Sequence, residues 1–195
     1  MIEYRTRLSI LEPEKIFTVS SEMLTWQSTD GSRGSLAYGD IRLVQLKFDP
    51  TRVVPDRYSM FITSRRNGQT IRINSHSYRG LGDFEDHRDE YRHFCLQLLA
   101  AIGKANPDTL FTGGISATRH RLYWLLLLFV LAGLVGAILF FFAIGIVWIA
   151  LAKVLLILWL LPSARRFMQR NKPVQFTADA IPPALLPPGN DRPPQ

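Results

Sequence analysis

Residues Leu122–Ala152 form 31 consecutive positions without Asp, Glu, Lys or Arg. The apolar character continues from Val154 to Pro162, so Lys153 is the only charge in the whole run. As one straight helix, the run would extend roughly 61 Å at about 1.5 Å per residue, about twice the ~30 Å hydrocarbon core of a bilayer. We therefore expect a membrane protein rather than a soluble globular one, and we exclude a single straight span.

Two helices joined by a tight turn near residues 143–148, where Gly145 lies, match the bilayer thickness. The first helix is predicted from about Leu122 to Phe142, and the second is predicted to end near residues 162–164. Interfacial anchors in membrane proteins are typically aromatic or basic. The residues that we expect to anchor this hairpin are Tyr123, Trp124, Trp148, Lys153, Trp159, Arg165 and Arg166.

Lys153 has three interpretations. If Trp148 marks the far interface, Lys153 lies about a turn and a half below it, and its long side chain can reach back to the headgroups. A buried lysine facing a partner or a transport path is the second interpretation, although the run contains no acid to pair with it. A re-entrant hairpin that never crosses the bilayer is the third. We favour the first.

Small residues in the first helix have the spacing that lets membrane helices approach closely, either within the hairpin or between chains of a homo-oligomer. These candidates for helix packing are Ala132, Gly133, Gly136 and Ala137.

The net charge of +7 is unevenly distributed. Residues 1–121 carry 17 Lys and Arg against 14 Asp and Glu, whereas residues 122–195 carry 6 against 2. The excess flanks the apolar run at residues 119–121 and 164–172, which suits anionic lipid headgroups and argues against nucleic-acid binding. The positive-inside rule then places both ends of a two-span hairpin in the cytoplasm. The chain begins without an apolar signal segment, so we expect the first 120 residues to stay on the side of the membrane where they are made.

The region before the helices is rich in short alternating segments of β-branched and aromatic residues. Strands are predicted at residues 15–20, 23–28, 35–38, 42–48, 58–63 and 70–74, with a weaker one at 4–10. Asp30-Gly31 and Asn67-Gly68 are typical of hairpin turns. An amphipathic helix follows, with Asp83 as its predicted N-cap and Gly103 and Pro107 at its end.

Seven strands and one helix in about 100 residues resemble the pleckstrin-homology-like (PH-like) fold, and more closely its bacterial membrane-anchored versions. The likeness rests on "FTVSSEMLTWQ", "GSLAYGDIRLVQLKF", the Asn67-Gly68 turn and "EYRHFCLQLLAAI". The resemblance implies an α+β fold, an antiparallel β-barrel or sandwich capped by the helix, and a transmembrane hairpin after it, located in the bacterial inner membrane. It implies no reaction. The segment "LEPEK" departs from the basic first hairpin of phosphoinositide-binding members, which argues against such a pocket.

Candidate chemistry in this region is weak. His87 and His93 lie six residues apart on the predicted helix and do not share a face, so we expect no metal site. Cys95, the only cysteine, lies on the apolar face of that helix and is expected to be buried and unreactive. We find no catalytic constellation and predict neither a cofactor nor an enzyme.

These features predict a PH-like cytoplasmic domain (1–106), a linker (107–120), a transmembrane hairpin (121–165) and a basic, then Pro-rich, cytoplasmic tail (166–195). The tail contains apolar residues that are unusual in a spacer, and we hypothesise that it docks on its own domain or on a partner, in a groove or at a sheet edge. The predicted function is membrane-tethered recognition of a protein or lipid. The alternative is an accessory subunit of a larger membrane complex, such as a transporter or envelope assembly, with the hairpin as the interface.

Overall fold

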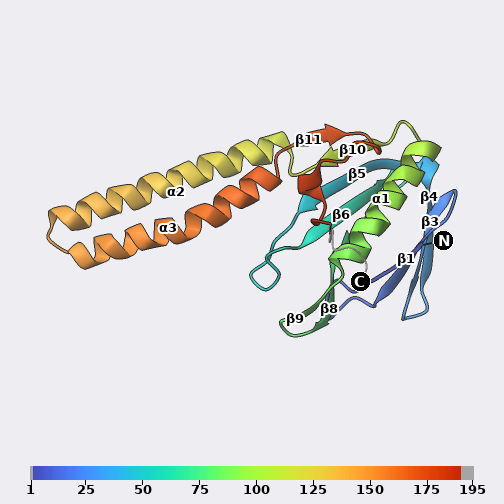
Figure 1. Ribbon diagram of the computed structural model, residues 1–195, viewed down its shortest axis with the longest axis horizontal. Coiled ribbons are helices and arrows are strands. Elements are labelled where there is room, and N and C mark those ends of the chain that lie inside the picture. The colour runs from blue at the N-terminus through green and yellow to red at the C-terminus, as the bar shows by residue number, and fades with distance from the viewer. Residues whose placement is uncertain (1, 190–195) are drawn as a thin grey trace. The chain divides into compact units, whose positions relative to one another are not determined.

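The computed structural model describes residues 2–189, and its elements are drawn in Figure 1. The fold is mixed α+β, as predicted, and divides into two compact units. Among the described residues, the first unit combines 2–114 with 174–189, and we call it the β-rich unit. The second comprises 115–173, and we call it the helical hairpin.

One sheet of the β-rich unit is an antiparallel meander in the order β1-β2-β3-β4. Its strands are β1 (Ile2–Thr6), β2 (Lys15–Val19), β3 (Met23–Ser28) and β4 (Arg33–Ala37). Inward side chains alternate with outward ones, and Tyr4, Phe17 and Leu24 are almost completely buried. A short 3-10 turn, η1 (Tyr38–Asp40), leads from β4 into the second sheet.

The second sheet has five strands in the order β11-β10-β5-β6-β7. They are β5 (Ile41–Phe48), β6 (Tyr58–Ser64), β7 (Thr70–Asn74), β10 (Leu110–Gly113) and β11 (Val174–Phe176). Strands β5, β6 and β7 form antiparallel pairs, whereas β10 runs parallel to β5. Each of the seven predicted strands has a counterpart in the two sheets, although the one predicted at 4–10 is observed as β1. The structure adds β10 and β11 to the second sheet.

Helix α1 (Arg88–Ala105) packs its apolar face into the core of the β-rich unit. The ring of Phe94 lies 5.2 Å from that of Tyr4 and 6.5 Å from that of Phe17, measured between centroids. At the other end of the helix, the Asn106 amide donates to the carbonyls of Tyr38 and Ile41, both at 3.0 Å. These bonds fix the helix to the connection between the two sheets.

The predicted start of this helix at Asp83 is wrong. Residues before it form a two-stranded hairpin, β8 (His76–Gly80) and β9 (Asp83–Asp86), and α1 begins only at Arg88 after the N-cap His87. Asp83 pairs with Gly80 across the turn instead of capping a helix. The acids after Asp83 suit the first turn of a helix as well as a short strand. The pairing of β9 with β8 decides for the strand, and the local pattern of residues does not reveal this pairing.

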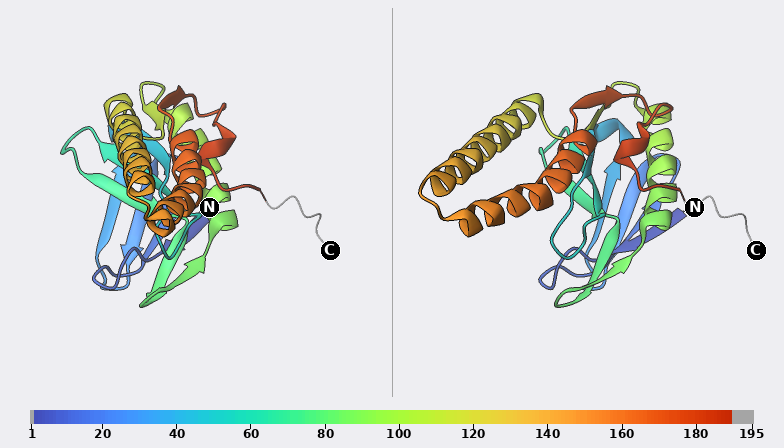
Figure 2. Two further views of the ribbon diagram at one scale, coloured as in Figure 1. Left: turned by 90° about the vertical axis from the view of Figure 1, so that its left-hand side faces the viewer. Right: turned by 60° about the vertical axis from the view of Figure 1, so that its left-hand side comes forward.

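The segment predicted as a linker, residues 107–120, contains β10, and helix α2 begins within it. The tail returns as β11, which pairs with the free edge of β10, and continues through the short 3-10 turn η2 (Pro183–Leu185). Leu185 and Leu186 are buried, and the Arg92 guanidinium of α1 donates to the carbonyl of Pro187 at 2.8 Å. The two views of Figure 2 show residues 174–189 running along the rest of the β-rich unit. Docking of the tail on its own domain is therefore what the structure shows.

The helical hairpin consists of α2 (Ala117–Ala143) and α3 (Val147–Arg170), and both are long and apolar enough to span a membrane. Gly145 has a φ of +78°, a left-handed conformation that glycine adopts without strain and that lets the chain reverse here. At the base of the hairpin, the Ile115 N–H donates to the carbonyl of Asn171. Helix α3 extends past its predicted end near residues 162–164, because the polar residues that follow favour helix.

Candidate functional site

The predicted anchors lie along the hairpin as follows. Tyr123 and Trp124 occupy the second turn of α2, where the Trp124 indole donates to His120 at 3.2 Å. The ring of Tyr123 packs edge-to-face on Phe167 of α3 at 6.1 Å, so one predicted anchor joins the two helices near the hairpin base. Arg165 and Arg166 lie inside α3, in the two turns before its end.

Trp148 is the second residue of α3, and its side chain is 84% exposed. Trp159 is also exposed, and Lys153 lies six residues after the start of α3. The snorkelling interpretation of Lys153 assumes that this start of α3 lies at the membrane interface. The anchoring role of these residues stays a prediction.

The small residues of α2 do not all face α3. A Cβ atom added to Gly133 or to Gly136 would meet nothing within 4 Å. Ala132 is exposed and Ala137 is partly buried. The two glycines therefore do not mediate the approach of α2 to α3 within the chain, and they leave a smooth outward surface on the hairpin.

The hairpin is inserted between two neighbouring strands of one sheet. Gly113, the last residue of β10, pairs with Val174, the first residue of β11. Gly114, which immediately precedes the hairpin, donates its N–H to the carbonyl of Leu46 at 2.8 Å and accepts a hydrogen bond from the Gln45 amide at 2.7 Å. Both chain segments that lead to the hairpin thus leave the β-rich unit at one corner of its larger sheet.

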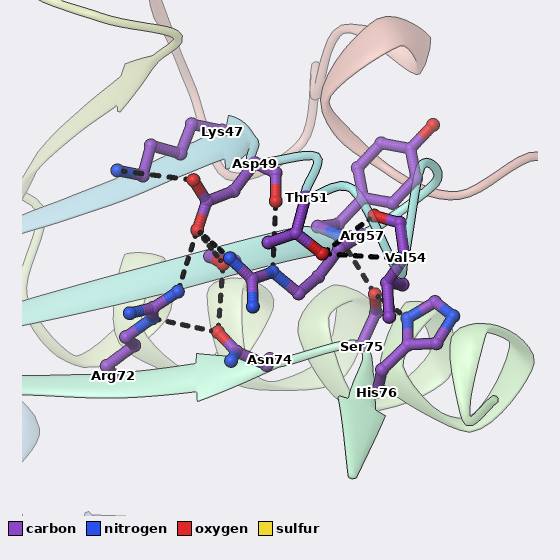
Figure 3. A network of polar contacts seen from close by, with 11 residues as sticks. Lys47, Asp49, Thr51, Val54, Arg57, Arg72, Asn74, Ser75 and His76 are labelled. Atoms are coloured by element: carbon purple, nitrogen blue, oxygen red, sulfur yellow. Dashed lines mark hydrogen bonds and ion pairs between the residues drawn. The ribbon is translucent and has the colours of Figure 1, made fainter. Parts of the chain in front are cut away.

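Next to that corner, three basic side chains surround one carboxylate (Figure 3). Asp49, directly after β5, accepts hydrogen bonds from Arg72 of β7 at 2.7 Å and from Arg57 at 3.2 Å. The ammonium of Lys47 lies 4.0 Å from the other Asp49 oxygen. We call Lys47, Asp49, Arg57 and Arg72 the Asp49 cluster. With three positive charges and one negative, its net charge is +2.

The Asp49 cluster lies on the face of the sheet away from the core. Lys47 and Arg72 are 4.4 and 5.5 Å from the ring centroid of Phe61, which lies between them on β6. Arg57 is the most buried of the three cations, and burial lowers the pKa of its guanidinium, an effect that the neighbouring Asp49 opposes. The sequence pattern did not reveal this cluster because its members come from different strands. The one local signal is that Lys47 and Asp49 are two residues apart and therefore lie on the same face.

The candidate metal ligands and the cysteine of the sequence lie as follows among residues 2–189. No group of three or more His, Cys, Asp or Glu side chains in this range is arranged to hold a metal ion. His87 instead pairs with Glu85 and Glu90 at 3.2 and 3.1 Å. Cys95 is buried in α1, as predicted.

We expect Cys95 to resist alkylation in the folded protein. Burial raises the pKa of its thiol to about 12, so that at roughly pH 8 about one thiol in ten thousand is ionised, and the sulfur is also shielded from reagent. Labelling of the full-length protein in detergent with iodoacetamide, followed by mass spectrometry, measures this protection. Leu81→Cys, at a fully exposed turn position, is the reactive control. Equal labelling of both thiols would contradict the buried placement.

The stability of the β-rich unit is expected to fall as the pH drops below about 6.5, in part through His76. Burial lowers the pKa of this imidazole in the folded state, and the nearby Asp86 only partly opposes the effect. The unfolded chain therefore binds a proton first, and stability that is complete above the unfolded pKa is lost as the pH falls toward the folded one. Cys95 labelling rates at several pH values, compared with those of His76→Gln, measure this contribution. An identical pH dependence in the variant would assign the acid sensitivity to other groups.

No protein-family model, curated protein or solved structure matches this chain.

Proposed function

We propose that this protein is a non-enzymatic, membrane-anchored PH-like domain protein of the bacterial inner membrane. Its β-rich unit recognises a protein or lipid at the cytoplasmic face, and both termini are cytoplasmic. The observation that carries this proposal is the insertion of the apolar hairpin between β10 and β11, through the Gly113–Val174 pair. Two chain connections hold the domain to its membrane segment, which restricts its position more than a single linker does.

Tethering explains how a domain that makes only weak contacts can be useful. A domain confined to the bilayer surface meets other surface-bound molecules at a high effective concentration, so weak contacts suffice for recognition. The exposed edges of β4 and β7 and the loops between strands are the surfaces available for such contacts.

In-cell crosslinking of the tagged full-length protein tests this proposal. A photoreactive residue is placed in the β-rich unit at Gln69 in one variant, and in the hairpin at Leu139 in another; both positions are exposed. Mass spectrometry then identifies the captured molecules. Capture through the β-rich unit supports tethered recognition, and recovery of the protein in the soluble fraction would overturn it.

The second candidate function is an accessory subunit of a larger membrane complex, a transporter or envelope assembly. The outward position of Gly133 and Gly136 favours it, because small residues on a helix surface allow a second membrane helix to approach closely. Gly133→Leu combined with Gly136→Leu should disrupt such an assembly and leave Cys95 protection unchanged. The same substitutions should have no effect on partner capture by the β-rich unit if the first function holds.

A further inference from the structure

Three loops lie at the same end of the β-rich unit as the connections to the hairpin. The β5–β6 loop (49–57) starts three residues after Leu46, which bonds Gly114. The β1–β2 loop (7–14) and the β8–β9 turn (81–82) extend in the same direction. Tyr4 of β1 bonds the end of β7 at Asn74, and Tyr78 of β8 donates to the carbonyl of Arg7. We call these three loops the anchored-end loops.

The tips of the anchored-end loops expose apolar side chains. Leu81 is 100% exposed, Leu11 91%, Ile10 66% and Val53 54%. Isolated exposed leucines are common on soluble proteins. Here, however, each of three separate loops carries one or two such residues, at the end of the unit that is covalently attached to the apolar hairpin.

Cations accompany these tips at the β5–β6 corner. Lys47 and Arg72 of the Asp49 cluster are partly exposed, and Arg52 is exposed in the loop beside Val53. Together with Arg57, these side chains outnumber Asp49 and Asp56 by two. At the β8–β9 hairpin, Glu85 and Asp86 are paired with Arg79 and Arg88 at 2.6 and 2.7 Å, which reduces their repulsion of an anionic surface.

The short connection from Gly114 to the uncharged run keeps this end of the β-rich unit close to lipid. From Gly114 to the start of α2 at Ala117, three residues span at most about 10 Å. The five helical steps from Ala117 to Leu122, the first residue of the uncharged run, add about 8 Å. Gly114 is therefore held within about 18 Å of the hydrocarbon boundary, and β5 and its loop continue past the level of the Leu46–Gly114 bond.

We propose that the anchored-end loops are a bilayer-contacting surface, in which Leu11, Val53 and Leu81 enter the headgroup region while Lys47, Arg52 and Arg72 contact lipid phosphates. The partner is the anionic lipid surface that surrounds the protein's own hairpin. Apolar side chains and cations together are the combination that binds such interfaces. The inference rests on the proposed membrane anchoring and adds a defined orientation of the β-rich unit, with the β6–β7 turn pointing away from lipid.

Fluorescence quenching by lipid tests this orientation. Val53→Cys in the full-length protein is labelled with an environment-sensitive dye; Cys95 is buried and needs no replacement. The protein is reconstituted in vesicles of phosphatidylcholine, alone or mixed with phosphatidylglycerol, that contain a quencher-bearing lipid. Gln69→Cys, in the β6–β7 turn at the other end of the larger sheet, is the matched labelling control. We expect strong quenching at position 53, increased by phosphatidylglycerol and decreased by salt, and weak quenching at position 69.

Two pairs of variants separate the apolar and electrostatic contributions. Quenching at position 53 gives the ratio of protein with the anchored-end loops docked on the bilayer to protein with these loops undocked. Leu11→Ser with Leu81→Ser should lower this ratio at least roughly fivefold. Met23→Ser, which changes an exposed residue at the far end of the smaller sheet, should leave the ratio unchanged. Lys47→Gln with Arg52→Gln should lower the ratio in phosphatidylglycerol vesicles by roughly fivefold per charge. Arg65→Gln with Arg66→Gln removes the same charge at the β6–β7 turn and should have no effect.

The outcomes distinguish this inference from the proposed function. Vesicle flotation is measured on every sample. A protein that floats with the vesicles but shows equal quenching at positions 53 and 69 retains its anchor and overturns the bilayer-contacting surface. A protein that does not float overturns the membrane anchoring and the surface that depends on it.

Discussion

Deletion of residues 174–195 is expected to destabilise the β-rich unit by on the order of 5 kcal/mol, a large share of the ~5–15 kcal/mol typical of a folded domain. The deletion removes β11 from the edge of β10 and uncovers the site of Leu185 and Leu186, which are 2% and 3% exposed. Truncation of one buried leucine alone costs about 2–5 kcal/mol. The rate of Cys95 alkylation in detergent measures the effect, and we expect it to increase by between about three and four orders of magnitude.

Point variants in the tail refine this test. Leu185→Ala with Leu186→Ala should reproduce most of the loss, while Ala184→Ser, on the exposed side of the same turn, should change stability by less than about 0.5 kcal/mol. Gly113 explains why the fit is tight, because a Cβ atom there would lie 2.7 Å from the Val174 side chain and closer still to that of Leu185. Unchanged Cys95 protection after the full deletion would show that the tail only covers a unit that is stable by itself.

Asp49→Asn is expected to destabilise the β-rich unit by about 1.5–3 kcal/mol, the usual range for hydrogen bonds to a charged group. The substitution preserves the size of the side chain but removes the only carboxylate of the Asp49 cluster, and Arg57 is left with a neutral partner while its side chain is only 14% exposed. Arg72 and Ser59 lose the same charged acceptor. Cys95 labelling again reports the change.

The same variant should act in the opposite direction at the membrane. Loss of a negative charge beside Lys47 and Arg72 raises the net charge of the cluster, so quenching at position 53 in phosphatidylglycerol vesicles should increase even though stability in detergent falls. Asp40→Asn is the matched control, since Asp40 pairs with the largely exposed Arg66 of the β6–β7 turn and should contribute at most about 1 kcal/mol. Equal losses of stability in the two variants would contradict the special role of Asp49.

The accuracy of the sequence-based prediction depended on how local each pattern was. Alternating residues such as Val44, Leu46 and Phe48 defined a strand by themselves, and the uncharged run defined a hairpin by its length alone. Asp83 was misassigned as a helix cap because the acids that follow it suit a helix start as well as a short hairpin. Strands β10 and β11 were missed because each is short and is stabilised by a partner distant in the chain.

The sequence by itself determined that this protein has a β-rich part, an amphipathic helix and two helices long and apolar enough to span a membrane, because periodicity, turn residues and hydrophobic length are properties of neighbouring residues. Only the tertiary structure decided that the tail completes the same sheet from which the hairpin departs. It also decided that Lys47, Arg57 and Arg72 meet at one carboxylate, and that Leu11, Val53 and Leu81 lie at one end. The physical reason is that these arrangements depend on strand pairing between residues as many as 65 and 67 positions apart, which no local pattern encodes.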